Sequence, residues 1–501
     1  MCIVCDRDDI SVRPEPTIPI VGDVMSLASH HYHFIGVGGI GMSGLAELLV
    51  RQGYTVSGSD LAANALTEKL QHLGARIFQG HAPDQVDGAQ VVVISSAIGL
   101  DNPELRAAMA KNVPILSRAQ MLAALMAEKK QIAIAGTHGK TTTTTMVAAV
   151  LQQGGLAPSI MVGGVVDNLG SNAFWDQGDY FVAEADESDG SFLVLSPHVA
   201  VVTNIERDHL DHYRDLQHIQ EIFGKFVSQI QPDGCLVACV DDPQVRLLLP
   251  ELAGRVCTYG LQAGADYQAR QIKVDGRGSA YTLVQHGQEL GQVRLPLAGQ
   301  HYVCNSLAAA AVGFALGLDF TAIKKGLAQT GKIKRRFEIK GEVQGITVID
   351  DYGHHPTEVK VTLAAMAQAY KGRRLVVAFQ PHRYSRTQAL LPDFFPVFSE
   401  ARLVFLTDIY GAGERVIPGL SGRELYLGVK KTGHAGVYYV AGRTDLTKEL
   451  WKKVRPGDVV VTMGAGDIWR TGEELLRLLA SRSLSVNLPR QSLAASASEV
   501  C

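Results

Sequence analysis

The stretch Ile132-Ala-Ile-Ala-Gly-Thr-His-Gly-Lys-Thr-Thr-Thr-Thr-Thr145 decides the fold class, because an apolar strand runs into a short glycine-bounded turn and then into a helix. Gly136 and Gly139 let the backbone aim N–H groups at phosphate oxygens, Lys140 supplies a cation, and the Thr141 hydroxyl can bind Mg²⁺. The glycines lie closer together than in the usual P-loop, but a shorter loop still forms an anion-binding nest. The alternative is a threonine-rich helix start with a surface lysine. The strand–loop–helix context favours a nucleoside triphosphate site.

Length and composition predict a multidomain α/β protein. A chain of 501 residues exceeds what one hydrophobic core normally supports, and its 51 glycines fit many tight strand–helix turns. The net charge of −3 gives no electrostatic reason to expect nucleic acid as a partner. No run of 18 apolar residues occurs and residues 1–30 lack the apolar core of a signal peptide, so we expect a cytoplasmic protein without membrane insertion.

The seven cysteines agree with a reducing compartment. Cys2 and Cys5 form a lone C-x-x-C pair, for which we expect neither a metal nor a redox role. The remaining internal cysteines lie among apolar residues and are expected to be small core hydrophobes; they are Cys235, Cys239, Cys257 and Cys304. Met25 is an alternative start, because order is expected to begin near His31.

The alternation of apolar runs and helix-period segments predicts three domains: an N-terminal Rossmann-like domain, a central P-loop-type ATPase domain and a C-terminal Rossmann-like domain. Their expected bounds are 1–30 for a flexible extension, 31–128, 129–332 and 333–485 for the domains, and 486–501 for a disordered tail. In the first domain we expect strands at 32–37, 54–58, 75–78, 91–95 and 113–116 and helices at 45–51, 66–73 and 103–111. In the others we expect strands at 180–184, 199–204, 347–350, 375–379, 403–406, 437–440 and 459–462, β-rich segments at 255–296, a helix at 302–318 and a basic hinge at 332–337.

A second glycine motif, Gly36-x-Gly38-x-x-Gly41, follows the first predicted strand, with Asp60 about 20 residues further on. This pattern satisfies a dinucleotide fingerprint, in which an acidic residue binds a ribose. Alone it is permissive: the turn could hold NAD, FAD, another nucleotide pyrophosphate, or no ligand at all.

A dense carboxylate run follows the predicted strand at 180–184 and consists of Glu184, Asp186, Glu187 and Asp189. Four neighbouring negative charges repel one another, and this repulsion must be offset by solvent or by a cation. Mg²⁺ commonly bridges protein carboxylates and nucleotide phosphates. A solvated acidic loop is the alternative. Since the carboxyl ends of neighbouring parallel strands share one sheet edge, the phosphate loop favours the Mg²⁺ interpretation.

The segment Asn204-Ile-Glu-Arg-Asp-His-Leu-Asp-His212 follows the next strand. Histidine and aspartate could also bind zinc, as in a hydrolase, but no H-E-x-x-H or cysteine cluster completes a tetrahedral set. We therefore expect His209 to serve Mg²⁺ beside ATP and His212 to be a surface residue at a helix start.

Two polar segments of the third domain, residues 350–356 and 380–386, both follow apolar strands. They bring His354, His382, Arg383 and Arg386 toward one edge. Arginine forks bind carboxylate or phosphate, so these residues and the basic hinge predict a site for an anionic second substrate or a transferring phosphoryl group. Arg386 could instead form a surface ion pair.

With these motifs in place, the chain resembles the Mur ligases over about residues 31–480. The resemblance lies in HFIGVGGIGMSGLAELL, GTHGKTTTT, EADESDGSF, TNIERDHLDHY, GQHYVCNSLAAA, RRFE, DDYGHHPTEV and FQPHRYSRT. It implies an ATP-dependent ligase that joins L-alanine to the lactyl carboxylate of UDP-N-acetylmuramate through an acyl phosphate, in peptidoglycan synthesis.

The resemblance also implies roles for individual residues. ATP would be bound by Gly136, Thr137, His138, Gly139, Lys140, Thr141, Thr142, His301 and Asn305, and Mg²⁺ by Thr141, Glu184 and His209. The substrates would be bound by Gly38, Gly39, Gly41, Asp60, His81, Arg336, Tyr352, His382 and Arg386. The catalytic residues would be Lys140, Glu184, His209, His354 and Arg383. Lys225 lies where several relatives carry a carbamoylated lysine and is left unassigned.

Three rival functions remain open from the sequence. A murein-peptide ligase would join a tripeptide to the same UDP-sugar. An NAD-dependent oxidoreductase would use the Gly36-x-Gly38-x-x-Gly41 motif, and a regulatory module would bind nucleotides without chemistry. We expect a monomer or a weak homodimer.

Overall fold

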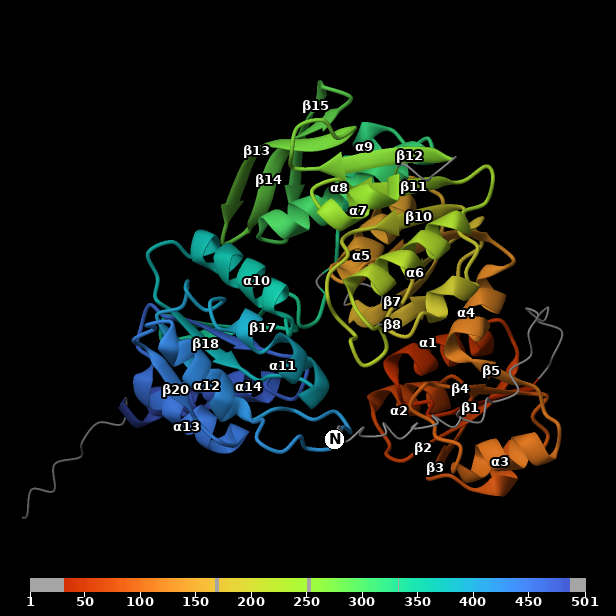
Figure 1. Cartoon of the computed structure of the whole chain (residues 1–501), viewed down its shortest axis with the longest axis horizontal. Helices are drawn as coiled ribbons and strands as arrows, with labels where there is room; N and C mark the ends of the chain where they lie inside the picture. The colour runs from red at the N-terminus through yellow and green to blue at the C-terminus, as the bar shows by residue number, and fades with distance from the viewer. Residues whose placement is uncertain (1–30, 167–170, 250–253, 332, 487–501) are drawn as a thin grey trace, which may run out of the picture. The chain divides into compact units, whose positions relative to one another are not determined.

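The computed structural model describes residues 31–166, 171–249, 254–331 and 333–486, and Figure 1 shows its helices and strands. The chain divides into two compact units, one ending at Glu128 and the other beginning at Lys129. The expectations for residues 1–30 and 487–501, which include those for Cys2 and Cys5, lie outside the described residues. Within the described ranges, no helix combines the length and the apolarity needed to cross a membrane.

The first unit is a five-stranded parallel sheet with strand order β3-β2-β1-β4-β5. The order runs outward from β1 on both sides, so the expected doubly wound α/β arrangement is confirmed. Its strands are β1 (His31–Ile35), β2 (Thr55–Asp60), β3 (Arg76–Gln79), β4 (Val91–Ile94) and β5 (Ile115–Ser117). Its helices are α1 (Ile40–Arg51), α2 (Ala65–His72), α3 (Pro103–Ala110) and α4 (Arg118–Met126), with a 3₁₀ turn at Pro83–Val86.

Helix α4 was not predicted from the sequence, although a local signal for its start is present. Ser117 Oγ accepts a hydrogen bond from the Gln120 N–H at 3.2 Å, and Gln120 Oε1 accepts from the Ser117 N–H at 2.8 Å. This reciprocal pair is a capping box, which satisfies two backbone groups that a helix start leaves unpaired. The strand before it, β5, begins two residues later than predicted.

The second unit contains two sheets. The middle segment (residues 129–331) has ten strands in the order β15-β14-β13-β12-β11-β10-β6-β9-β7-β8, with β6 parallel to both β10 and β9. Its strands are β6 (Lys130–Ala135), β7 (Ser159–Val166), β8 (Ser171–Phe174), β9 (Tyr180–Glu184), β10 (Val199–Val202), β11 (Cys235–Cys239), β12 (Arg255–Gly260), β13 (Tyr267–Asp275), β14 (Gly278–Gln285) and β15 (Gln288–Leu295). Its helices are α5 (Lys140–Gln153), α6 (Leu216–Ser228), α7 (Pro243–Leu248), α8 (Gln300–Ala315) and α9 (Phe320–Ala328), with a 3₁₀ turn at Ser191–Val194.

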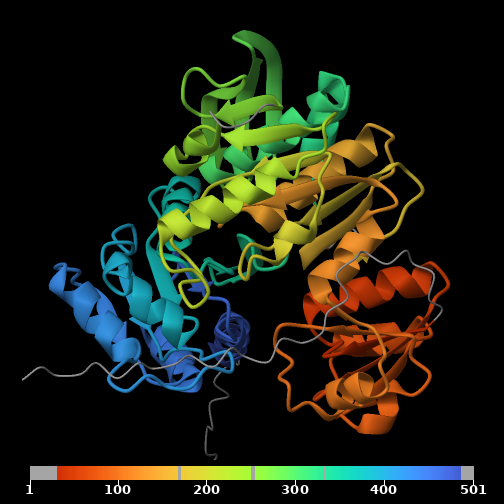
Figure 2. The ribbon, with the colours of Figure 1, turned by 45° about the vertical axis from the view of Figure 1, so that its right-hand side comes forward.

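The C-terminal segment (residues 333–486) has six strands in the order β16-β17-β21-β18-β19-β20. All neighbours pair in parallel except β16 and β17, which are antiparallel. Its strands are β16 (Glu338–Val343), β17 (Ile346–Asp351), β18 (Leu375–Phe379), β19 (Leu403–Leu406), β20 (Val437–Tyr439) and β21 (Val459–Met463). Its helices are α10 (Pro356–Ala369), α11 (Tyr384–Leu390), α12 (Gly422–Lys431), α13 (Arg443–Lys453) and α14 (Trp469–Val486), with a 3₁₀ turn at Pro392–Phe394. In Figure 2 the middle segment runs from orange to green and the C-terminal segment from cyan to blue.

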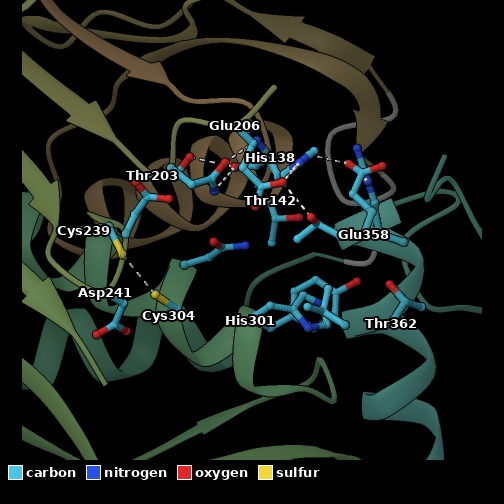
Figure 3. Close-up of a pocket in the computed structure, with 18 of the residues that line it drawn as sticks. His138, Thr142, Thr203, Glu206, Cys239, Asp241, His301, Cys304, Glu358 and Thr362 are labelled. Atoms are coloured by element: carbon cyan, nitrogen blue, oxygen red, sulfur yellow. Dashed lines mark hydrogen bonds and ion pairs between the residues drawn. The ribbon is translucent and has the colours of Figure 1, made fainter. Parts of the chain in front are cut away.

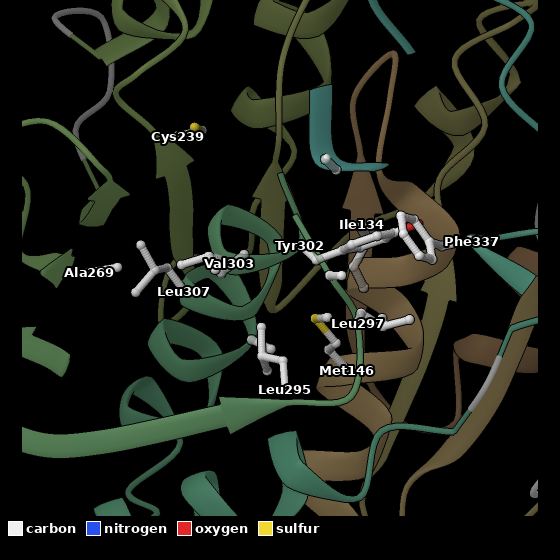
Figure 4. Close-up of a cluster of buried hydrophobic side chains, with 14 of the residues drawn as sticks. Ile134, Met146, Cys239, Ala269, Leu295, Leu297, Tyr302, Val303, Leu307 and Phe337 are labelled. Atoms are coloured by element: carbon white, nitrogen blue, oxygen red, sulfur yellow. The ribbon is translucent and has the colours of Figure 1, made fainter. Parts of the chain in front are cut away.

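Buried side chains of α8, α5 and β6 share one hydrophobic cluster. Val303 and Leu307 of α8 are fully buried, as are Ile134 of β6 and Met146 of α5, and they belong to one hydrophobic cluster (Figure 4). Burying one such side chain contributes about 1.5–3 kcal/mol. The loop between β6 and α5 is therefore mounted on a rigid strand and a rigid helix.

Glycines allow α5, α8 and α9 to approach one another closely. A Cβ built on Gly326 of α9 would lie 2.5 Å from the Cα of Val150, and one on Gly313 of α8 would lie 2.9 Å from Val150 Cγ1. Real carbon atoms do not approach that closely, so any side chain at Gly326 would force α9 away from the backbone of α5.

We expect Gly326→Ala to destabilise the protein by about 1–3 kcal/mol through this overpacking. Gly224→Ala is the matched control, because Gly224 is also helical but a Cβ there would meet no atom within 4 Å. The control should be neutral or stabilising by about 0.5–1 kcal/mol, since alanine favours the helix. Thermal and urea unfolding measure both effects. Equal stability of the two variants would show that the α5–α9 approach is not as close as described.

Candidate active site

The phosphate loop, residues 136–139, has a backbone that requires glycine at both ends. Gly136 and Gly139 have φ angles of +129° and +85°, and a Cβ on Gly136 would lie 2.1 Å from Thr203 Oγ1. The N–H of His138 donates to Asn204 Oδ1 at 2.8 Å, which ties the loop to the residues after β10. Because the first N–H groups of a helix lack intrahelical acceptors, the start of α5 favours an anion at this loop.

Lys140 lies folded against the loop and is paired with a buried carboxylate. Its Nζ donates to the Gly136 carbonyl at 2.6 Å and to Glu187 Oε1 at 2.8 Å. Burial alone would lower the pKa of Lys140, but the carboxylates of Glu187 and Asp186 outweigh burial and raise the pKa above its ordinary value. The lysine therefore carries its charge at neutral pH and stays within reach of a phosphate in the loop.

The four carboxylates after β9 divide into two kinds. Asp186 Oδ1 accepts from the Ser188 N–H and Asp189 Oδ1 from the Ser191 N–H, so these two cap local turns. Glu184 accepts from the Gly163 N–H at 2.5 Å and also bonds the Thr141 hydroxyl. Burial raises the pKa of Glu184, and it raises the pKa of Glu187 to about 7 despite the nearby Lys140.

His209 completes this group from the loop after β10. Its Nε2 lies 3.8 Å from Glu187 Oε1 and 3.7 Å from Asp208 Oδ2. Burial lowers the pKa of His209, which keeps the imidazole neutral and able to bind a cation.

These donors fit a Mg²⁺ ion beside a nucleotide. Thr141 and Glu184 offer hard oxygens in contact with each other, and the neutral ring of His209 lies at the same loop edge. A divalent cation would also keep the buried carboxyl of Glu184 ionised, against the burial that raises its pKa. Lys225, the other candidate for this region, is exposed on α6.

A cavity of about 480 Å³ opens beside the phosphate loop (Figure 3). Gly139, His301 and Asn305 line it, and a Cβ on Gly139 would lie 2.9 Å from Asn305 Oδ1. Burial and the charge of Arg336 lower the pKa of His301 to about 4. A neutral imidazole in a cavity of this size is suited to a flat, uncharged ring such as a nucleobase.

The cysteine prediction is only partly correct. Cys235, Cys239 and Cys257 are buried in the core cluster. Cys304, however, is only partly buried, and it lines the cavity together with Cys239. Cys239 ends β11 and Cys304 lies on α8, and the packing of these two elements brings both thiols to the cavity wall. The spacing of the two cysteines along the chain did not reveal this.

His138 links the phosphate loop to the C-terminal segment. Its ring nitrogens lie 3.4 Å from Glu206 Oε2 and 3.3 Å from Glu358 Oε1, ion-pair distances that are long for hydrogen bonds. Burial would lower the pKa of His138, but these two carboxylates raise it to about 9. Glu206 also accepts from Thr357 Oγ1 at 2.6 Å. Neither glutamate was assigned a role from the sequence.

Residues 333–337 of the expected basic hinge pack into the C-terminal segment, and residue 332 lies outside the described residues. Arg335 Nε donates to Asp350 Oδ2 at 2.9 Å, and the Arg336 guanidinium lies over the Tyr352 ring at 5.2 Å from its centroid. Burial would lower the pKa of Arg336, but Glu358 and Asp351 raise it. Arg336 and Tyr352, both predicted to bind substrate, thus lie together.

The two arginines predicted near the reaction centre contact the same loop as His209. Arg386 Nε donates to Asp208 Oδ1 at 2.9 Å in a buried pair, so Arg386 is not a surface ion-pair residue. Arg383 Nη2 donates to Asp211 Oδ2 at 3.0 Å and its Nε to Glu414 Oε1 at 2.6 Å. An anionic substrate at these arginines would have to compete with Asp208 and Asp211.

His354 and His382 lie beside these arginines, with ring centroids 5.9 Å apart. Burial lowers the pKa of His354 to about 3, and burial together with Arg386 lowers the pKa of His382 to about 4. Both rings are therefore neutral at physiological pH and can orient a polar group without adding charge.

In the first unit, Asp60, the residue predicted to bind a ribose, holds the glycine loop. Asp60 Oδ2 accepts from the Gly38 N–H at 2.8 Å. His81 Nδ1 lies 2.7 Å from Glu104 Oε1, and Glu104 Oε2 lies 2.6 Å from His33 Nε2. Glu104 was not predicted, because nothing in its local sequence distinguishes it from other glutamates in a first helical turn. The roles of Gly38, Gly39, Gly41, Asp60 and His81 stay predictions.

The raised pKa of His138 predicts a pH-dependent stability. Since its folded pKa is about 9 and its ordinary value 6.5, the stabilisation is fully present below about pH 6.5 and lost as the pH rises through 9. We expect the Tm of the native protein to fall more between pH 6.5 and 9.5 than that of His138→Asn. The exposed His286→Asn variant, whose partner is Asp266, should follow the native curve. Parallel curves for native protein and His138→Asn would contradict the assigned ion pairs.

The chain is similar to known proteins along most of its length. It matches the Mur ligase family, catalytic domain over residues 31–130, the Mur ligase middle domain over 134–313 and the Mur ligase, glutamate ligase domain over 335–466. It is 48% identical over 452 residues to the UDP-N-acetylmuramate–L-alanine ligase of Desulfosudis oleivorans, which covers 90% of this chain and 99% of that protein.

Two solved structures extend the comparison. The UDP-N-acetylmuramate-alanine ligase of Thermotoga maritima has a TM-score of 0.77 and 29% identity, covering 90% of this chain and 99% of that one. A murein peptide ligase of Psychrobacter arcticus has a TM-score of 0.67 and 24% identity, covering 90% and 98%, and shows likeness of fold alone. With three domain matches in order and a relative this similar over nearly its whole length, the chain belongs to the Mur ligase family.

Proposed function

We propose that the protein is an ATP-dependent ligase that joins L-alanine to the lactyl carboxylate of UDP-N-acetylmuramate in peptidoglycan synthesis. The observation that carries this proposal is the phosphate loop, in which Lys140 is paired with Glu187 while Glu184 and His209 face it. The similarity to UDP-N-acetylmuramate–L-alanine ligases along the whole chain supports the choice of substrates.

The proposed reaction has two steps. A carboxylate oxygen of the sugar attacks the γ-phosphorus of ATP, and ADP leaves. The amine nitrogen of L-alanine then attacks the acyl carbon, and phosphate leaves as the nitrogen loses a proton. A carboxylate is a poor electrophile, so the first step supplies a leaving group for the second.

The phosphate loop provides positioning and charge for the first step. The N–H groups at the start of α5 and the Lys140 ammonium bind the β- and γ-phosphates, and they offset the charge that develops during transfer. Thr141, Glu184 and His209 would hold a Mg²⁺ ion, which would supply positive charge to neutralise the transferring phosphate. Thr137, His138 and Thr142 complete the loop around the phosphates, and His301 and Asn305 bind the adenine side.

The C-terminal segment provides the second site. Arg383 pairs with Asp211 and Arg386 with Asp208. We assign the two arginines to the substrate carboxylate and to the charge of the tetrahedral intermediate. The neutral rings of His354 and His382, with Tyr352 and Arg336, orient the amino acid. A pKa of about 3 makes His354 a weak base, so it acts by hydrogen bonding rather than by taking a full proton.

The decisive experiment measures phosphate release with ATP and Mg²⁺ while UDP-N-acetylmuramate or L-alanine is omitted in turn. We expect sustained release only when both are present, and a UDP-linked product whose mass includes one alanine. Replacing L-alanine by the tripeptide tests the murein-peptide alternative, which predicts turnover with the tripeptide and not with alanine. Absence of phosphate release with every combination would leave only nucleotide binding.

We expect Lys140→Ala to reduce ADP formation by about 10²-fold or more, because the variant lacks the cation that stabilises the transferring phosphate. Binding of UDP-N-acetylmuramate, measured by calorimetry, should change little, since the glycine loop assigned to it lies in the other compact unit. Lys431→Ala, which alters an exposed lysine at the end of α12, is the matched control. An equal loss of UDP-sugar binding in Lys140→Ala would refute the separation of the two nucleotide sites.

A further inference from the structure

The cavity beside the phosphate loop carries two thiols and a carboxylate on one wall. Cys239 ends β11, Asp241 follows two residues later, and Cys304 lies on α8 (Figure 3). The two sulfur atoms are 3.7 Å apart. Ligand atoms of all three residues lie within 4.8 Å of one another. Nothing in the proposed ligase reaction uses these groups.

The spacing of the sulfurs is that of two thiolates on one tetrahedral ion. With Zn–S bonds of about 2.3 Å, two thiolates on a tetrahedral zinc ion lie about 3.8 Å apart. A disulfide would require the sulfurs at about 2.05 Å. The wall can therefore accept an ion with little rearrangement of the two cysteines, while a disulfide would require both side chains to move.

The carboxylate of Asp241 is held in one position by two backbone N–H groups. Its Oδ2 accepts from the Leu261 N–H at 2.7 Å and its Oδ1 from the Gln262 N–H at 3.0 Å. Such outer hydrogen bonds fix the direction of ligating carboxylates, and each oxygen keeps a second lone pair. The neighbouring Asp242 is used differently, because it caps the start of α7.

We propose that Cys239, Asp241 and Cys304 form a binding site for a thiophilic divalent cation of the Zn²⁺ type, whose open fourth position faces the cavity and which obstructs nucleotide binding there. Soft sulfur ligands select zinc over Mg²⁺, which prefers oxygen donors, so the ATP-associated Mg²⁺ does not compete for this site. The binding of the ion is independent of the ligase reaction. Its inhibitory effect rests on the proposed function, because it assumes that ATP enters this cavity.

Cobalt(II) is the spectroscopic probe for the site, added to the full-length protein with its thiols kept reduced. We expect one equivalent of Co²⁺ to produce the sulfur-to-metal charge-transfer and intense visible bands of a tetrahedral thiolate site, and one equivalent of Zn²⁺ to abolish them. Cys239→Ala and Cys304→Ala should lose the bands, and Asp241→Asn should bind Co²⁺ more weakly. Circular dichroism and Tm establish that each variant is folded.

Cys257→Ala is the matched control, since it alters a buried thiol that does not line the cavity. It should keep the bands in full. Bands that persist in Cys304→Ala, or that vanish in Cys257→Ala, would overturn the assignment of the site. The absence of sulfur-to-metal charge-transfer bands when Co²⁺ is added to the native protein would also overturn the assignment.

The inhibitory effect is tested by steady-state kinetics at a buffered free Zn²⁺ concentration. We expect the apparent KM for ATP to rise at least 10-fold with kcat unchanged, and a chelator to restore it. For each variant, the apparent KM for ATP with zinc is divided by the apparent KM without zinc. This ratio should be about one in Cys304→Ala. Unchanged KM in a native protein that shows the cobalt bands would refute the obstruction of the cavity. A protein with no ligase activity at all would refute the proposed function and leave the cobalt result standing.

Discussion

The pairing of Lys140 with Glu187 is the interaction on which the phosphate loop depends. Both side chains are largely removed from water, and neither charge would be tolerated there alone, because removing one partner of a buried pair typically costs about 3–5 kcal/mol. The lysine also donates to the Gly136 carbonyl, so the pair fixes the loop as well as the charge. The left-handed glycines and the Asn204 anchor then place the start of α5 at the same point.

The middle and C-terminal segments meet through polar rather than apolar contacts at this edge. His138 lies between Glu206 and Glu358, and His355 Nε2 lies 3.2 Å from the Arg207 carbonyl. Burial would lower the pKa of His138, but Glu206 and Glu358 raise it to about 9, so this contact between the two segments depends on protonation.

Hard oxygen ligands and soft sulfur ligands lie in two different places near the phosphate loop. Thr141 and Glu184 present oxygen at the β9 edge, while Cys239 and Cys304 present sulfur on the cavity wall. Because ligand softness and coordination geometry select the metal, the two groups need not share an ion. The proposed Mg²⁺ and Zn²⁺ sites would therefore not compete for the same ion.

The strand–glycine–lysine–helix pattern at 132–145 determined the phosphate loop from the sequence alone, because its geometry depends on neighbouring residues and on glycine's access to positive φ. The alternating apolar runs likewise indicated the three α/β sheets, of which only the first is entirely parallel. The sequence could not distinguish Asp186, which caps a turn, from Glu187, which pairs with Lys140, since both are carboxylates in one run. Nor could the sequence show that Cys239 lies beside Cys304. Contacts between residues far apart in the chain depend on how whole strands and helices pack, and only the tertiary structure decided that packing.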